Sequence, residues 1–152
     1  MKSAETSGIG RVETVVIVDD DEADIAMTRR VIEATWPQVG AHAVKSGEAL
    51  IRYLQGEDEF SDREKYPYPT FLLLDLKMPG MHGFDVLRWL TLHPPHNLIP
   101  VVVLTASGQV PMAHLAYQLG ARSFLTKPLA ASEFENMIGK FEPKSELRKQ
   151  GG

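Results

Sequence analysis

Phe71-Leu-Leu-Leu-Asp75 is the stretch of sequence on which the fold of this chain depends. Its four apolar residues are continuous, whereas a strand with one face in water alternates apolar and polar residues. A continuous run predicts a strand that is buried on both faces, in the middle of a parallel sheet. The same pattern occurs in Val15-Val-Ile-Val18 and Val101-Val-Val-Leu104. Two weaker strands are predicted near His42–Lys45 and Ser123–Thr126.

Helical patterns alternate with these runs. From Glu22 to Thr35 the apolar residues recur at helical spacing, with Asp21 placed to cap the start of the helix and Pro37 to end it. Four more helices are predicted at about 47–55, 83–92, 111–119 and 132–141. The last of these opens with a capping-box pattern, Ser132-x-x-Glu135. The charged segment from Gln55 to Pro69 is predicted to be a surface loop.

Strict alternation of five strands and five helices predicts an α/β fold. With right-handed crossovers, such a chain forms a doubly wound parallel sheet. At 152 residues the chain has the length of one domain, with 43% hydrophobic and 24% charged residues. We expect the ordered domain to cover residues 13–141. Residues 1–12 and 142–152 are expected to be flexible tails, the latter too short for a DNA-binding module.

Composition excludes several classes of function. The net charge of −4 argues against nucleic acid or an anionic membrane as the main partner, because both require a basic face. The absence of cysteine excludes disulfides, thiolate metal sites and cysteine nucleophiles. No apolar run approaches the ~20 residues that span a bilayer, and Met1–Arg11 lacks the apolar core of a signal peptide. These features predict a cytoplasmic protein.

Polar side chains follow four of the predicted strands. Asp19-Asp20-Asp21 comes after the first strand, Asp75 after the third, Thr105 after the fourth and Lys127 after the fifth. In an open parallel sheet these strand ends meet at one edge, where such folds bind ligands. Taken singly, each has an ordinary explanation: an acid can cap a helix, a threonine can cap a turn, and a lysine before a proline can be exposed. Their joint placement favours a functional site.

The chemistry of this set favours phosphoryl transfer. Clustered carboxylates raise one another's pKa unless a cation lies among them, and oxygen ligands alone favour Mg²⁺. Lys127 can supply a positive charge to a phosphoryl oxygen, and the hydroxyl of Thr105 can donate to another. Asp75 can then act as the nucleophile, since positioning and charge neutralisation are most of what phosphoryl transfer requires.

Four motifs resemble those of the response-regulator receiver family. They are Val16-Ile-Val-Asp-Asp-Asp-Glu22, Leu72-Leu-Leu-Asp-Leu-Lys-Met-Pro-Gly-Met-His-Gly83, Val103-Leu-Thr-Ala-Ser107 and Gly120-Ala-Arg-Ser-Phe-Leu-Thr-Lys-Pro128. The resemblance covers residues 13–141. It implies a flavodoxin-like sheet with strand order 2-1-3-4-5, and a response regulator that catalyses only its own phosphorylation and dephosphorylation.

The resemblance also implies roles for the acidic residues. Asp19 and Asp20 correspond to the family's acidic pair, with Asp20 a direct Mg²⁺ ligand. Asp75 corresponds to the residue that receives a phosphoryl group from a sensor histidine kinase. Asp75 itself and the backbone carbonyl of Lys77 are implied to complete the protein ligands of the metal.

Further positions correspond to the family's switch. Thr105 and Lys127 are implied to sense the phosphoryl group, and Phe124 stands where the family has its switch aromatic. Lys77 and Ser107 occupy positions that tune the lifetime of the phosphoryl group. The Lys127–Pro128 peptide is predicted to be cis, as in members of the family.

Finer features resemble single-domain regulators that partner phytochrome-type histidine kinases. They are the opening Asp19-Asp-Asp-Glu-Ala-Asp24, the long loop before the third strand, and Pro100-Val-Val-Val-Leu-Thr-Ala-Ser107. A sensor kinase of that type is therefore the expected partner.

Three other functions would use parts of this pattern. A haloacid-dehalogenase-type phosphatase would use Asp19 as nucleophile, but Glu22 replaces its usual glycine and Asp75 would have no role. A flavodoxin-like FMN carrier is rejected, because three aspartates in the first loop would repel a phosphate. A receiver that binds partners without being phosphorylated stays open as the third reading.

The last two helices and the last strand are predicted to form the partner surface, either a homodimer interface or a docking face. Tyr117, Phe134 and Phe141 are its apolar candidates, near Arg122 and Glu135. The alternative for Phe134 and Phe141 is that they pack inward as the core stripe of the last helix.

Overall fold

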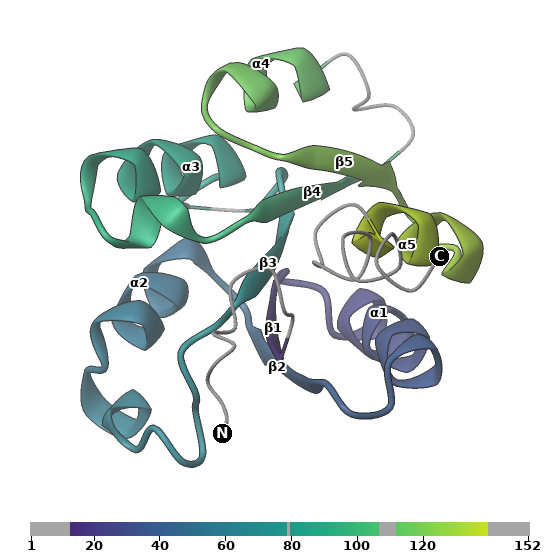
Figure 1. Cartoon of the computed structure of the whole chain (residues 1–152). Coiled ribbons are helices and arrows are strands. Elements are labelled where there is room, and N and C mark those ends of the chain that lie inside the picture. Colours follow the sequence, from purple (N-terminus) through teal and green to yellow (C-terminus); the bar gives the residue numbers. More distant parts are fainter. Residues whose placement is uncertain (1–12, 79, 107–111, 140–152) are drawn as a thin grey trace, which may run out of the picture.

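The computed structural model describes residues 13–78, 80–106 and 112–139. The predicted tails 1–12 and 142–152, together with Ser107 and Phe141, lie outside the described residues. Five parallel strands form a single sheet in the order β2-β1-β3-β4-β5, which confirms the predicted topology (Figure 1). The strands are β1 (Thr14–Val18), β2 (Gly40–Val44), β3 (Phe71–Asp75), β4 (Val101–Thr105) and β5 (Ser123–Thr126).

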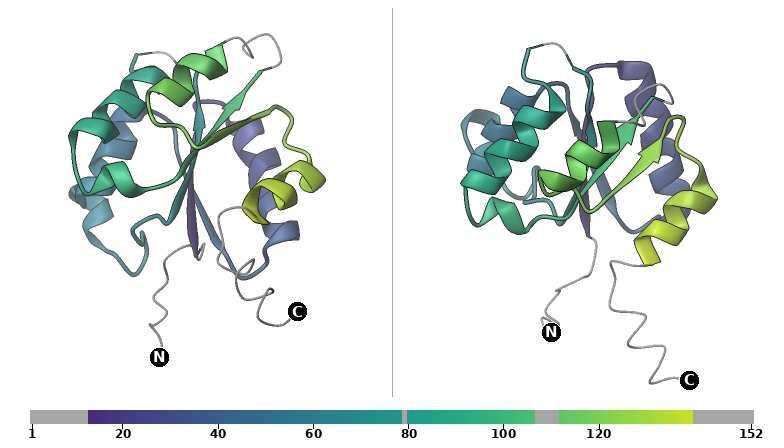
Figure 2. Two further views of the ribbon diagram at one scale, coloured as in Figure 1. Left: turned by 45° about the horizontal axis from the view of Figure 1, so that its top comes forward. Right: turned by 90° about the horizontal axis from the view of Figure 1, so that it is seen from above.

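The described residues also form five α-helices, which cover both faces of the sheet; α1 to α4 connect successive strands and α5 follows β5. They are α1 (Glu22–Thr35), α2 (Gly47–Gln55), α3 (Gly83–Leu92), α4 (Ala113–Gln118) and α5 (Ala131–Gly139). Figures 1 and 2 place α1 and α5 on one face, and α2, α3 and α4 on the other. None of the helices in the described part of the chain is both long and apolar enough to cross a membrane.

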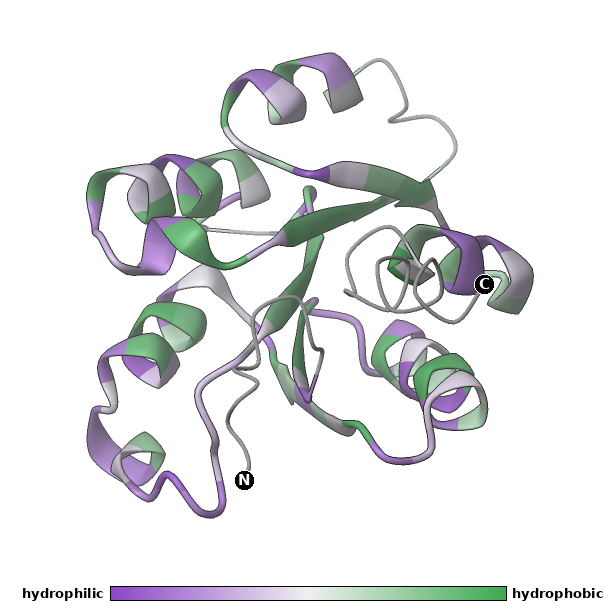
Figure 3. Ribbon diagram, viewed as in Figure 1, coloured by the Kyte–Doolittle hydropathy of each residue, from purple (hydrophilic) through white to green (hydrophobic). Residues whose placement is uncertain are grey.

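Burial follows the pattern of the apolar runs. Every residue of β1, β3 and β4 is buried, as a strand between two helical layers requires. The edge strands β2 and β5 are only partly buried. Figure 3 shows the strands as mainly apolar and the helices as apolar on one side. The three continuous runs therefore become the three central strands of the sheet.

The sheet separates two apolar clusters. One lies under α1 and α5, where Trp36 packs edge-on against Phe134 with ring centroids 5.4 Å apart. The other lies under α2, α3 and α4. Phe134 is fully buried, so its expected place on the partner surface was wrong and the inward-packing alternative holds for this residue. The reason is that α5 needs this ring to fill the space against α1.

Most helix ends lie at the residues predicted from the sequence. The carboxylate of Asp21 caps α1 by accepting a hydrogen bond from the backbone N–H of Asp24, over 3.0 Å. The bounds of α1, α2 and α3 are those predicted. The capping box predicted at Ser132 was wrong, because α5 already begins at Ala131 and Ser132 lies within its first turn.

The segment between α2 and β3 is more ordered than the predicted surface loop. It contains the short 3₁₀ helix η1 (Asp58–Ser61), whose Phe60 is buried. The Arg63 guanidinium donates to the backbone carbonyls of Tyr53, Leu54 and Tyr66. These contacts of Arg63 dock the charged connection onto the end of α2. A second 3₁₀ helix, η2 (His96–Leu98), precedes β4.

Candidate functional site

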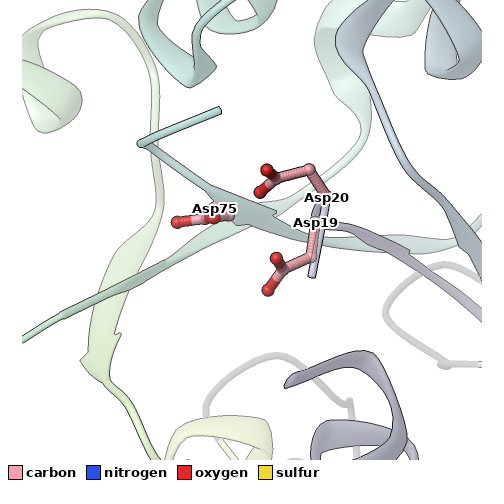
Figure 4. Close-up of side chains that lie close together, drawn as sticks. All are labelled: Asp19, Asp20 and Asp75. Atoms are coloured by element: carbon pink, nitrogen blue, oxygen red, sulfur yellow. The ribbon is translucent and has the colours of Figure 1, made fainter. Parts of the chain in front are cut away.

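Three carboxylates converge at the carboxyl ends of β1 and β3. Val18 of β1 pairs with Leu74 of β3, so the residues that follow, Asp19 and Asp75, come to lie close together. Asp19, Asp20 and Asp75 each offer an oxygen, and these oxygens lie within 4.8 Å of one another (Figure 4). Asp19 and Asp75 are buried whereas Asp20 is exposed. The structure thus assembles the predicted acidic set.

Lys127 brings a positive charge into this set from the end of β5. Its Nζ lies 2.8 Å from Asp19 Oδ2, 2.9 Å from Asp24 Oδ2 and 3.4 Å from Asp75 Oδ2. Its backbone N–H donates to the carbonyl of Thr105 over 2.9 Å, which fixes the lysine beside the end of β4. Burial by itself would lower the pKa of Lys127, but the surrounding carboxylates raise it above its usual value. Lys127 is therefore a cation at any physiological pH.

Asp75 lies in surroundings that oppose its charge. Burial raises the pKa of Asp75 to about 6, Lys127 partly offsets this effect, and the neighbouring Asp19 adds to it. Asp75 Oδ1 also accepts a hydrogen bond from the backbone N–H of Lys77, over 3.3 Å. A positive charge placed among these carboxylates would favour the ionised form of Asp75.

The donor set fits a hard divalent cation. Asp19 Oδ1 accepts from the backbone N–H of Asp21 over 3.0 Å. Asp19 Oδ2 is buried and ion-paired with Lys127, whose Nζ is 2.8 Å away, although among the described residues no hydrogen bond to it has good geometry. A cluster of carboxylate oxygens is the kind of site that Mg²⁺ or Ca²⁺ occupies. The residues present therefore fit a metal site.

The two predicted switch residues lie on neighbouring strands near this site. Thr105, at the end of β4, is buried, and its hydroxyl donates to the carbonyl of Ala106 over 3.2 Å. Phe124 of β5 is half-buried and packs edge-on against Tyr117 of α4, with centroids 6.1 Å apart. The Lys127–Pro128 peptide is cis, as predicted.

Sequence reasoning missed the contact between Asp24 and Lys127, which are 103 residues apart in the chain. Asp24 lies at the third position of α1, and an acidic residue there is usually explained by the helix dipole. The sequence contains no local signal that the side chain of Lys127, which follows β5, reaches the first turn of α1. Only the structure reveals this contact.

Comparison with known proteins matches residues 15–139 to the response regulator receiver domain family. The chain belongs to this family. It is therefore a receiver domain of two-component signalling, as the motifs indicated. An Asp19-dependent phosphatase of the dehalogenase type does not agree with this membership, and Asp21, the second acid of that motif, is occupied in capping α1.

Among curated proteins, this receiver domain is similar to response regulator Rcp1 of Synechocystis sp., with 29% identity over 126 residues, 83% of this chain and 84% of Rcp1. It also resembles the crystal structure of the phosphorylated cyanobacterial phytochrome response regulator RcpA, with a TM-score of 0.70 and 26% identity over 87% of this chain and 92% of that one. The Mn²⁺-bound form of Rcp1 gives a TM-score of 0.63 and 28% identity, covering 86% and 92% of the two chains. The predicted resemblance to phytochrome response regulators is confirmed.

Proposed function

We propose that this receiver domain accepts a phosphoryl group on Asp75 from a sensor histidine kinase, in a Mg²⁺-dependent reaction, and thereby changes what it binds. The observation that carries the proposal is that Asp75 lies beside both the carboxylates of Asp19 and Asp20 and the ammonium of Lys127. The similarity of this chain to a phytochrome response regulator supports a phytochrome-type kinase as the donor of the phosphoryl group.

In the transfer step, a carboxylate oxygen of Asp75 attacks phosphorus while the bond from phosphorus to the imidazole nitrogen of the donor breaks. The electron pair leaves with the imidazole, which takes a proton from water. Lys127 places its charge next to the phosphoryl oxygens, and the fixed geometry removes most of the entropy cost of the encounter. Attack by water on the acyl phosphate later returns Asp75 and inorganic phosphate. The domain thus catalyses only its own phosphorylation and dephosphorylation.

The metal would be held by the carboxylates of Asp19, Asp20 and Asp75 and by the backbone carbonyl of Lys77. When bound, Mg²⁺ would neutralise negative charge on the phosphoryl oxygens. The oxygen-only donor set supports this proposal. So does the similarity to an Mn²⁺-bound form of Rcp1.

The switch would consist of Thr105 and Phe124. A phosphoryl oxygen on Asp75 would attract the hydroxyl of Thr105 away from the carbonyl of Ala106, its present acceptor. The ring of Phe124, half-buried beside Tyr117, would then turn inward into the space that the threonine leaves. A ligand shifts only an equilibrium whose two states it distinguishes, and this hydrogen bond is the distinguishing contact.

The surface that reports the switch would be formed by α4, β5 and α5, either as a homodimer interface or as a docking face for another protein. Met112, Leu115 and Tyr117 of this region are exposed apolar residues. The ring of Tyr117 packs against Phe124, so a movement of Phe124 would alter the surface at Tyr117.

Labelling with a small phosphodonor tests the proposal. We expect the wild type to be labelled with Mg²⁺ and not with EDTA, and Asp75→Asn not to be labelled at all. Asp62→Asn, which changes an exposed carboxylate of the connection before β3, is the matched control and should be labelled like the wild type. An unlabelled wild type would favour the open alternative of a receiver that binds partners without phosphorylation. Full labelling of Asp75→Asn would show that the acceptor is a different residue.

A further inference from the structure

Besides its ion pair with Asp19, 2.8 Å away, Lys127 donates a hydrogen bond to a carboxylate outside the acidic set. The bond to Asp24 Oδ2 is 2.9 Å long with hydrogen-bond geometry, whereas Asp75 Oδ2 lies at 3.4 Å. Asp24 does not belong to the group of three carboxylates that could hold a metal. Its contact with Lys127 therefore requires a separate explanation.

Both ends of this contact are anchored to the sheet or to a helix. Asp24 lies in the first turn of α1, where its backbone N–H donates to the capping carboxylate of Asp21. Lys127 is attached through its backbone N–H to the end of β4 at Thr105. The side chain of Lys127 is 19% exposed and that of Asp24 36%, so the hydrogen bond is partly shielded from water. A fixed and partly shielded carboxylate can control where the ammonium lies.

We propose that Asp24 is a positioning residue that competes with the phosphoryl group for the ammonium of Lys127, an inference that rests on the proposed function. An ammonium has three N–H donors. In this structure Asp24 takes one of them and Asp19 lies close to the ammonium, while the distance to Asp75 exceeds that of a strong charge-assisted hydrogen bond. The competition concerns the position of the ammonium: while bonded to Asp24 it stays 3.4 Å from Asp75, and a shift towards a phosphoryl group on Asp75 would lengthen the bond to Asp24.

This competition predicts whether the loss of the Asp24 charge favours or disfavours the phosphoryl-bound state. Asp24→Asn keeps the size of the side chain but removes its negative charge and weakens its hold on the ammonium. Lys127 then moves to a phosphoryl group at smaller cost, and the repulsion between Asp24 and the phosphoryl oxygens disappears. We expect the phosphoryl-bound state to be favoured roughly fivefold, a size typical of one partly exposed charge-assisted hydrogen bond.

Beryllofluoride, a mimic of the phosphoryl group, provides the test at saturating Mg²⁺ by isothermal titration calorimetry. Asp24→Asn should bind it roughly fivefold more tightly than the wild type. The matched control is Glu22→Gln, which removes the same charge from the same helical turn, but whose carboxylate pairs with Lys45 and not with Lys127. Its affinity should equal that of the wild type. Equal or weaker binding by Asp24→Asn, or an equal gain in Glu22→Gln, would overturn the inference.

The titration also separates this inference from the function on which it rests. A wild type that does not bind beryllofluoride would refute the proposed function itself, whereas binding without an effect of Asp24→Asn would refute only the role of Asp24. A second readout needs neither metal nor phosphoryl mimic. The side-chain ammonium resonance of Lys127, assigned by its loss in Lys127→Arg, should shift in Asp24→Asn and not in Glu22→Gln. An unchanged resonance in Asp24→Asn would count against the contact.

Discussion

Asp75 is a carboxylate whose surroundings favour the protonated form until a cation arrives. Burial raises its pKa to about 6 in the folded, metal-free protein, above the ordinary value of 3.8 that applies in the unfolded chain. A group whose pKa is raised by folding contributes stability below its unfolded pKa and loses that contribution as the pH rises through the folded value. Asp75 therefore destabilises the metal-free protein above about pH 6.

Asp75→Asn should accordingly stabilise the metal-free protein at neutral pH. We expect the free energy of unfolding in urea with EDTA to rise by about 1–3 kcal/mol at pH 7.5, from a shift of roughly two pKa units. The gain should shrink as the pH falls below about 6 and vanish only at about pH 3, below the unfolded value of 3.8, where the wild-type carboxyl group is protonated in both states. Glu33→Gln, an exposed change on α1, is the control and should lack this gain. A gain that persists in full at about pH 3 would contradict this explanation.

Thr105 offers a second test at the level of single residues. Thr105→Ala removes the hydroxyl that now binds the carbonyl of Ala106, so phosphorylation should continue while its effect on the ring of Phe124 is lost. The measurement is the chemical shift of the Phe124 ring with and without beryllofluoride. Thr105→Ser keeps a hydroxyl and should keep the response. The proposed coupling is wrong if the ring responds equally in Thr105→Ala and in the wild type.

At the scale of helices and strands, much of the structure could be predicted because local signals agree with the tertiary environment. The central strands were recognisable from continuous apolar runs, and α1 from its spacing and from the cap at Asp21. The site could be predicted in part for the same reason. Asp19, Asp75 and Lys127 each follow a strand, and parallel strands bring such residues to one edge.

Other features depend on contacts that no local pattern encodes. The connection before β3 is rich in charge, but Arg63 turns inward to three backbone carbonyls and Phe60 is buried. The inward packing of Phe134 depends on the distance between α5 and α1, which the sequence of α5 does not contain. The hydrogen bond between Asp24 and Lys127 likewise depends on a tertiary contact between residues 103 positions apart in the chain.

The cap of α1 makes a prediction at this scale. Asp21→Ala removes the acceptor for the backbone N–H of Asp24 and should lower the free energy of unfolding by about 1 kcal/mol. Asp21→Asn keeps an oxygen acceptor and should lose much less. Chemical denaturation of the three proteins at one pH measures the difference. Equal stability of Asp21→Ala and the wild type would mean that the cap contributes nothing.

At the scale of the whole molecule, the proposed partner surface predicts a change of assembly. Phe134 is buried, and among the described residues of this region the large exposed apolar ones are Met112, Leu115 and Tyr117, on or beside α4. Sedimentation at tens of micromolar should show a larger dimer fraction with beryllofluoride than without it, and Tyr117→Lys should reduce that fraction. If the protein is monomeric in both states, and charge reversal at Arg122 leaves partner binding unchanged, the output surface lies elsewhere.

The division of the core by the sheet has a consequence for how the domain tolerates change. Side chains under α1 and α5 and those under α2, α3 and α4 belong to separate clusters, with the fully buried strands between them. Distant sites without shared partners usually contribute independently to stability, within about 0.5 kcal/mol. Leu90→Ala on α3 and Ile138→Val on α5 should therefore have additive effects in a double-mutant cycle. Trp36→Phe and Phe134→Leu alter two rings in contact and should deviate from additivity by more than that. The sheet would then uncouple the two apolar clusters energetically. Side chains in one cluster could be substituted without compensating substitutions in the other.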